Sequence, residues 1–276
     1  MEKRIILKGL RVEEFIHPRE VQLQDSVINS PTVRKLIESV GDVNLRINKT
    51  RIQGTYIQLY PHTAPRVFAI LKDVCRILDH SDIPELYVWK SMNNSIMPCT
   101  AEKDYLILSD YVLEQYDDGM LYYGFGNAIA MIRAGHVKLT TAAAYMGCNI
   151  WTVLPQMKFK EYLHAADATS DRGGLLACQS LAAAARCHFL ELGMPPAVSR
   201  TMFATDEEAA DYIERYLFSV AEENDRQRLT TRLGEMWQSA VYFEAAANLM
   251  LADMYVWYRK EYKPLLEKYR REGGYL

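Results

Sequence analysis

Four side chains in the middle of the chain carry groups that bind divalent metal ions: His136, His164, Asp167 and Asp171. Positions i, i+3 and i+7 of a helix share one face, so His164, Asp167 and Asp171 could meet at one metal ion. The alternative is structural, with His164 at the start of a helix and the two aspartates stabilising its first turn. We favour the structural interpretation, because spacing alone does not show that the four groups converge.

The cysteines give no sign of a metal or redox site. None of the five belongs to a CxxC pair, so we expect buried apolar thiols rather than ligands or disulfides. They are Cys75, Cys99, Cys148, Cys178 and Cys187. The sequence also lacks P-loop, GxSxG and EF-hand motifs, and Gly124 and Gly126 form a glycine pair without the third glycine of a dinucleotide site.

The composition is that of an ordinary globular protein, in which 49% of the 276 residues are hydrophobic and 24% are charged. A net charge of -3 creates no field that would attract nucleic acid, so we expect no nucleic-acid partner. Lys8 interrupts the short apolar run at the N-terminus, which predicts no signal peptide and a cytoplasmic location. The uncharged stretch 139–157 is too polar for a membrane span, so we expect a buried helix and turn and no membrane association.

Hydrophobic periodicity predicts an α+β fold that is predominantly helical, with one small antiparallel sheet. Alternating side chains at Val43–Ile47 predict a strand, and Tyr56–Leu59 predicts a second. Glu85–Trp89 and Asp104–Leu108 are rich in β-forming residues and predict the sheet with an exposed edge.

Helices are predicted for most of the remaining chain. Pro65 begins an amphipathic helix, and the chain is nearly all helical from Asp110 onward. Thr205 and Glu208 have the spacing of a capping box at the start of a later helix. The charged segment 222–228 is typical of a solvated loop.

Two segments in the helical region have residue types in a distinctive sequence. Gly126–His136 reads GNAIAMIRAGH, and Asp167–Ala177 reads DATSDRGGLLA. The first is similar to the G-H-E-x-x-H-I-x-x-G-H helix, and the second to the E-x-x-x-D-R-x-G segment, of the HtpX and CAAX-prenyl-protease family of zinc metallopeptidases. The resemblance covers about residues 63–184 and implies a zincin-like metallopeptidase scaffold. It divides a single domain into N-terminal strands (1–62), a zincin-like core (63–204) and C-terminal helices (205–276).

The chain departs from that family at the residues that carry the chemistry. In HExxH helices two histidines one turn apart bind zinc, and the glutamate between them deprotonates the bound water. Asn127 and Met131 stand at the histidine positions and Ala128 at the glutamate position. An amide is a weak neutral ligand, a thioether prefers Cu(I), and alanine has no basic group. With only Asp167 left at the third ligand position and Asp171 at a supporting one, we expect no zinc, no cofactor and no catalytic residue here.

These departures lead to our main interpretation, a catalytically inactive metallopeptidase homologue that acts as a peptide- or protein-binding scaffold or regulatory partner. The family's substrate lies along an edge strand above the zinc helix. The corresponding edge here contains Asn94, Ser95, Ile96 and Met97, which could bind a peptide through backbone hydrogen bonds. An active paralogue is one candidate partner, and self-association stays open. Two alternatives remain, a metal-dependent peptidase or hydrolase that uses the four metal-binding side chains above as substitute ligands, and a metal-free enzyme.

Three further expectations concern packing. Asp171 and Arg172 are expected to form a buried or half-buried ion pair. Tyr122 and Tyr123, like the aromatic side chains near the C-terminus, are expected to belong to the core. The tail 270–276 is expected to fray.

Overall fold

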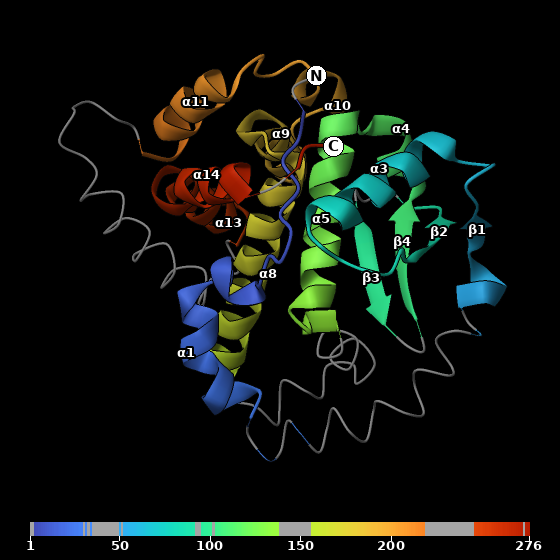
Figure 1. Cartoon of the computed structure of the whole chain (residues 1–276), viewed down its shortest axis with the longest axis horizontal. Helices are drawn as coiled ribbons and strands as arrows, with labels where there is room; N and C mark the ends of the chain where they lie inside the picture. The colour runs from blue at the N-terminus through green and yellow to red at the C-terminus, as the bar shows by residue number, and fades with distance from the viewer. Residues whose placement is uncertain are drawn as a thin grey trace.

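The computed structural model describes residues 3–29, 31, 34, 50, 52–91, 95–100, 103–137, 156–218, 246–272 and 274–276. These residues are mostly helical and contain one four-stranded sheet, which confirms the predicted α+β class. Figure 1 shows helix α5 (Asp118–Arg133) between the sheet and helix α8 (Gln156–Cys178). The predicted strand at Val43–Ile47, the uncharged stretch up to residue 155 and the charged segment 222–228 lie outside the described residues.

The sheet is mixed and not antiparallel as expected. Its strands are β1 (Ile57–Leu59), β2 (Glu85–Trp89), β3 (Ile96–Thr100) and β4 (Asp104–Ser109), in the spatial order β1-β2-β4-β3. After β2 the chain forms β3 at the far edge and then returns as β4 between them. Strand β4 therefore runs parallel to β2, and the pairs β1–β2 and β3–β4 are antiparallel.

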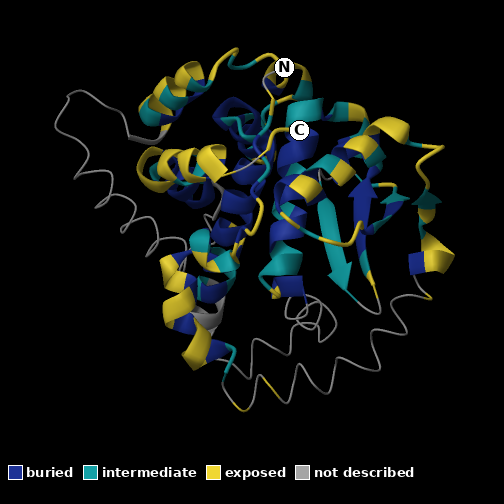
Figure 2. Ribbon diagram, viewed as in Figure 1, coloured by how far each residue is buried: buried dark blue, intermediate teal, exposed yellow. Residues whose placement is uncertain are grey.

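The two faces of the sheet contact different sets of side chains. Leu86, Leu106 and Leu108 belong to the main core, together with the apolar face of α3 (Pro65–Ile77) and with α5. Tyr87 and Tyr105 lie on the opposite face, in a second small cluster. The darkest, most buried ribbons in Figure 2 run along α5 and α8, so the centre of the molecule is the contact between these two helices.

The remaining helices surround this centre. They are η1 (Val12–Glu14), α1 (Pro18–Val27), α4 (Asp110–Gln115), α9 (Leu181–Glu191), α10 (Pro196–Ser199), α11 (Asp206–Phe218), α13 (Ala246–Trp257), the π-helical turn η3 (Tyr258–Tyr262) and α14 (Lys263–Glu272). The predicted cap of α11 is present, because Thr205 Oγ1 accepts a hydrogen bond of 3.2 Å from the backbone N–H of Glu208. Among the described residues, no helix is both long and apolar enough to cross a membrane.

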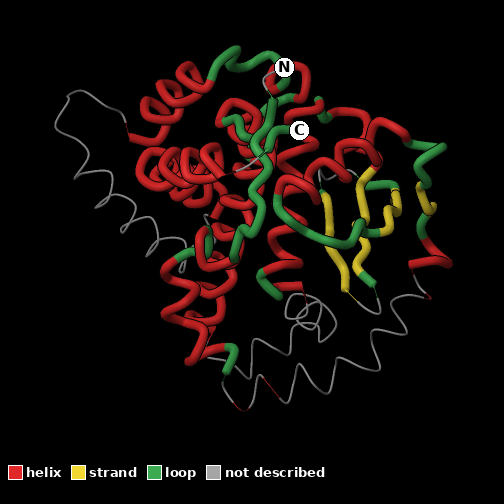
Figure 3. The backbone as a smooth tube through the Cα atoms, viewed as in Figure 1, coloured by secondary structure: helices red, strands yellow, loops and turns green. Residues whose placement is uncertain are grey.

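The two ends of the chain meet beside the end of α8, where the N-terminal segment runs as a loop (Figure 3). Ile5 forms an isolated antiparallel bridge with Tyr275, and the backbone N–H of Leu276 donates to the carbonyl of Arg4. The side chain of Gln179 binds both the N–H and the carbonyl of Ile5, at 2.9 Å and 2.7 Å. The expectation of a frayed C-terminal tail is wrong, because its last residues are bonded to the N-terminal segment.

Candidate functional site

Helices α5 and α8 approach each other closely because glycine and alanine occupy their contact. A Cβ added to Gly126 would lie 2.3 Å from Cβ of Ala177, and one added to Gly173 would lie 2.1 Å from Cβ of Ala130. Residue numbers rise along α5 as they fall along α8, so the two helices run antiparallel. The two segments that resemble the family motifs therefore lie against each other.

The residue at the first metal-ligand position of the family contacts the second segment. The Asn127 amide nitrogen donates a hydrogen bond of 2.8 Å to Asp171 Oδ1, and the Tyr123 hydroxyl donates one of 2.7 Å to the same oxygen. Ala128 is completely buried in the core, whereas Asn127 and Met131 are half-buried. The structure thus brings Asn127 and Asp171 together, whereas Ala128 points into the core and not toward Asp171.

Asp171 has an unusual electrostatic environment. Burial raises its pKa to about 7, although the hydrogen bonds from Tyr123 and Asn127 oppose this shift by stabilising the carboxylate. Burial also lowers the pKa of His188, which lies 2.8 Å from the Tyr123 hydroxyl through Nε2. Asp171 and His188 are therefore two titratable groups joined by one tyrosine.

Asp167 lies one helical turn before Asp171 and is exposed, with no hydrogen bond among the described residues. Surrounding protein atoms and the charge of Asp171 raise its pKa to about 7, and His136 acts in the opposite direction. The exposed carboxylate also contacts water, which screens these interactions.

The four candidate substitute ligands do not converge on one point. His136 is buried, and its Nε2 lies 2.7 Å from Oε1 of buried Glu20 in α1. His164 lies in the interior of α8 and not at a helix start, so the expectation that the aspartates stabilise a first turn is wrong as well. Across the described ranges, no group of three histidine, cysteine or acidic residues could hold a metal ion.

Arg172 is buried, as expected, but its partner is Asp253 and not Asp171. The Arg172 guanidinium lies 3.1 Å from Asp253 Oδ2, and His17 Nε2 lies 3.0 Å from Oδ1 of the same residue. Burial acts to raise the pKa of Asp253, but the Arg172 charge and the hydrogen bond with His17 hold it below its usual value. On an α-helix, consecutive side chains point about 100° apart, so Arg172 faces α13 while Asp171 faces α5.

Strand β3 is one of the two edge strands of the described sheet and packs on α5. A Cβ added to Gly124 would lie 2.7 Å from Ile96 Cδ1, so the glycine permits this close contact. Ser109 N–H donates to the Ser95 carbonyl across the β3–β4 ladder, which makes Ser95–Ser109 a hydrogen-bonded pair. Hydrogen-bonded and non-hydrogen-bonded pairs alternate along an antiparallel ladder. The next pair, Ile96–Leu108, is therefore not hydrogen-bonded, and the N–H and C=O groups of Ile96 point away from β4.

The same alternation places the other outward groups of β3. The carbonyl of Pro98 and both backbone groups of Thr100 point away from β4, whereas Met97 and Cys99 bond toward it. Proline lacks an N–H, and here the missing donor falls on the outer side, where the ladder with β4 does not need it. Of the predicted edge residues, Asn94 lies outside the described part of the chain.

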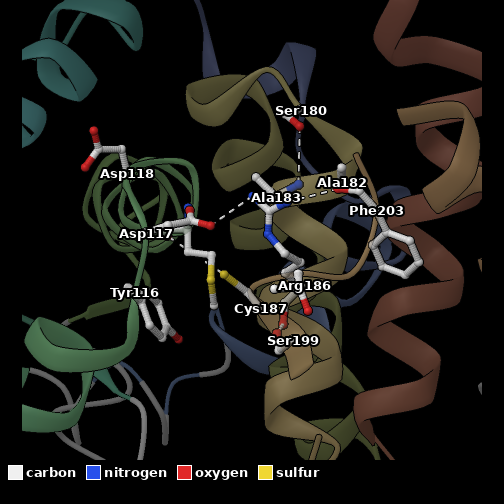
Figure 4. A network of polar contacts seen from close by, with 12 residues as sticks. Tyr116, Asp117, Asp118, Ser180, Ala182, Ala183, Arg186, Cys187, Ser199 and Phe203 are labelled. Atoms are coloured by element: carbon white, nitrogen blue, oxygen red, sulfur yellow. Dashed lines mark hydrogen bonds and ion pairs between the residues drawn. The ribbon is translucent and has the colours of Figure 1, made fainter. Parts of the chain in front are cut away.

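Helix α9 is anchored so that His188 faces α5. Figure 4 shows Arg186 reaching Asp117 at the start of α5, with 3.1 Å between Nη2 and Oδ2. The Ser180 hydroxyl accepts from the backbone N–H of Ala183 and caps α9. Arg186, in the middle of α9, thereby connects this helix to Asp117, the N-cap of α5, and His188 lies two residues further along α9.

Sequence reasoning missed His188 as a site residue and assigned Tyr123 to the core alone. The signal for His188 was a single histidine in the largely apolar segment Leu181–Leu190, a position where burial requires a hydrogen-bond partner. Comparison of the chain with protein-family models, with curated proteins and with solved structures gave no match in any of the three.

Proposed function

We propose that this chain is a catalytically inactive relative of the HtpX-type zinc peptidases, and that it binds an extended segment of a peptide or protein along β3. The observation that carries the proposal is the hydrogen bond between Asn127 and Asp171. In the family resemblance these residues occupy a zinc-ligand position and a position that supports the metal. This contact joins two segments more than 40 residues apart in the sequence, and it supports the proposal.

The chemistry of the side chains argues against peptide hydrolysis by the family's mechanism. Zinc-dependent hydrolysis needs three protein ligands and a base for the bound water. Asn127 uses its amide N–H groups on Asp171, and buried Ala128 has no basic group at the position of the general base. Loss of the general base alone typically lowers the rate by about 10²–10⁴.

The edge strand supports binding without hydrolysis. Ile96 and Thr100 each offer an outward N–H and C=O, and Pro98 offers an outward C=O. A partner strand can add to such an edge through main-chain hydrogen bonds and take its specificity from alternate side chains. Strand β3 lies directly against α5 at Gly124, one turn from Asn127. Side chains of a bound segment would therefore lie close to Asn127.

We propose a peptide or a protein segment as the partner, with an active paralogue as one candidate, in the cytoplasm. Affinity purification from the native host followed by mass spectrometry identifies it. An absence of any stoichiometric partner would count against a scaffold role.

The test compares peptide binding by the wild-type chain and by two variants of Ile96. Peptides selected from a random display library are measured by fluorescence polarisation. I96P removes the outward N–H but leaves the β3–β4 ladder intact, and I96A removes the same side-chain contacts but keeps the N–H. Since one net hydrogen bond contributes about 0.5–1.5 kcal/mol, I96P should bind about 2–10-fold more weakly than I96A.

Two results would contradict the proposal. Equal affinity of I96P and I96A would show that the edge strand is not the binding site. Cleavage of the selected peptides in the presence of zinc, seen by mass spectrometry, would favour an active metal enzyme with substitute ligands instead.

A further inference from the structure

The Tyr123 hydroxyl stands between two groups that both lie within hydrogen-bond distance of it. Its oxygen is 2.7 Å from Asp171 Oδ1 and 2.8 Å from His188 Nε2. A hydroxyl has one proton, so Tyr123 can donate to only one of these neighbours and must accept from the other. All three side chains are buried, which excludes water as a replacement partner on most of their surface.

With a neutral histidine, two arrangements of protons satisfy this chain of contacts. In the first, Tyr123 donates to the Asp171 carboxylate and His188 donates from Nε2 to the tyrosine oxygen. In the second, Asp171 carries a proton on Oδ1 and donates it to Tyr123, which donates in turn to His188 Nε2, while the imidazole proton sits on Nδ1. The histidine is neutral in both arrangements. The second holds one more proton in total, and neither requires the heavy atoms to move.

The extra proton has a route from solvent. His188 Nδ1 has no hydrogen-bond partner among the described residues, and it lies 4.0 Å from Oε2 of Glu191. Half of the Glu191 side chain is exposed (49%). A proton can therefore arrive at Nδ1 beside Glu191, and the Nε2 proton can pass to Tyr123 as the tyrosine proton passes to Asp171.

We propose that Asp171, Tyr123 and His188 form a proton relay that makes the hydrogen bond between Asp171 and Asn127 depend on pH. In the deprotonated arrangement Asn127 donates to an anionic oxygen, and in the protonated arrangement it donates to the weaker hydroxyl acceptor. The relay therefore controls how firmly the Asn127 amide is held on the surface next to β3. Its relevance to ligand binding rests on the proposed function, whereas the relay itself does not.

The charges around the relay place its transition near neutral pH. Burial raises the pKa of Asp171 to about 7 and lowers that of His188, so the proton resides on the carboxyl and not as a second proton on the imidazole. Other groups face the relay from α8, α9 and α13. They are Asp167 and Arg172 on α8, Cys187 and Glu191 on α9, and Asp253 on α13.

The test follows the His188 ring by nitrogen-15 NMR of histidine-labelled protein between pH 5.5 and 8.5, a window chosen to bracket a transition at about pH 7. The His188 signals are assigned by their loss in H188Q. We expect the ring proton to move from Nε2 to Nδ1 as pH falls, with the same midpoint in the Asn127 side-chain amide resonance. Y123F should abolish the tautomer change.

Y122F is the matched control, because Tyr122 is the next residue on α5 and donates its hydroxyl proton to Asp73, away from the relay. It should behave as the wild type does. A wild-type His188 that keeps its proton on Nε2 across the range, or that becomes doubly protonated, would overturn the proposal. The measurement needs no ligand, so a working relay in a chain that binds no peptide would refute the proposed function alone.

Discussion

Substitution of Gly173 by alanine should separate α5 from α8. The new Cβ would lie 2.1 Å from Cβ of Ala130, whereas carbon atoms in contact prefer about 3.5–4.0 Å. Both atoms are Cβ atoms, whose positions are fixed by the helix backbone, so no change of side-chain rotamer can relieve the overlap. The helices must therefore move apart or bend until this distance has grown by about 1.4–1.9 Å.

The size of the effect follows from two opposing terms. Overpacking in a rigid core costs about 1–3 kcal/mol, and a contact between two helix backbones lies at the upper end. Alanine recovers about 1 kcal/mol relative to glycine in a helix. The free energy of unfolding of G173A should therefore fall by about 2 kcal/mol, with loss of the 2.8 Å bond between Asn127 and Asp171.

Urea denaturation followed by circular dichroism measures this change. A130G removes the opposing Cβ, so the double variant A130G/G173A should be more stable than G173A alone, although A130G by itself is destabilising. G54A is the control, because Gly54 lies in a short helix with nothing within 4 Å of an added Cβ. The reasoning is refuted if G173A loses less than about 0.5 kcal/mol, or if the losses of the two single variants simply add.

Two further predictions concern the buried charges. R172M leaves buried Asp253 with His17 but without its arginine, and should lower the free energy of unfolding by about 3–5 kcal/mol; a loss under 1 kcal/mol would show that the pair is dispensable. Asp171 contributes stability that is fully present below its ordinary pKa of 3.8 and is lost as pH rises through about 7, because the folded chain retains a proton that the unfolded chain releases. D171N should therefore lose less stability than the wild type between pH 4 and 7, and identical pH profiles would contradict the raised pKa.

Local patterns were sufficient to predict individual helices and strands. Pro65 begins α3 and Ile57–Leu59 forms β1, as expected. The direction of β4 relative to β2 could not be predicted, because it depends on the intervening β3. That strand carries Pro98 and no alternating pattern, so its sequence gives a weak strand signal.

One contact in the candidate site agrees with an expectation from the sequence, and the contacts of Arg172 and His188 were not predicted. The order of the two motif-like segments predicted that Asn127 and Asp171 belong to one site, and the structure places them in contact. The partner of Arg172 is Asp253, which is 81 residues away, and no local spacing indicates such a pair. His188 escaped notice for the same reason, because its role depends on a tyrosine 65 residues earlier in the chain.

Backbone amide hydrogen exchange of the chain with and without a selected peptide tests the central claim most directly. The account predicts that a bound peptide slows exchange at Ile96 and Thr100, whose N–H groups point away from β4. Exchange at Met97 should change little, since its N–H already bonds toward β4. Unchanged exchange at Ile96 and Thr100 under saturating peptide would contradict the claim that β3 is the binding edge.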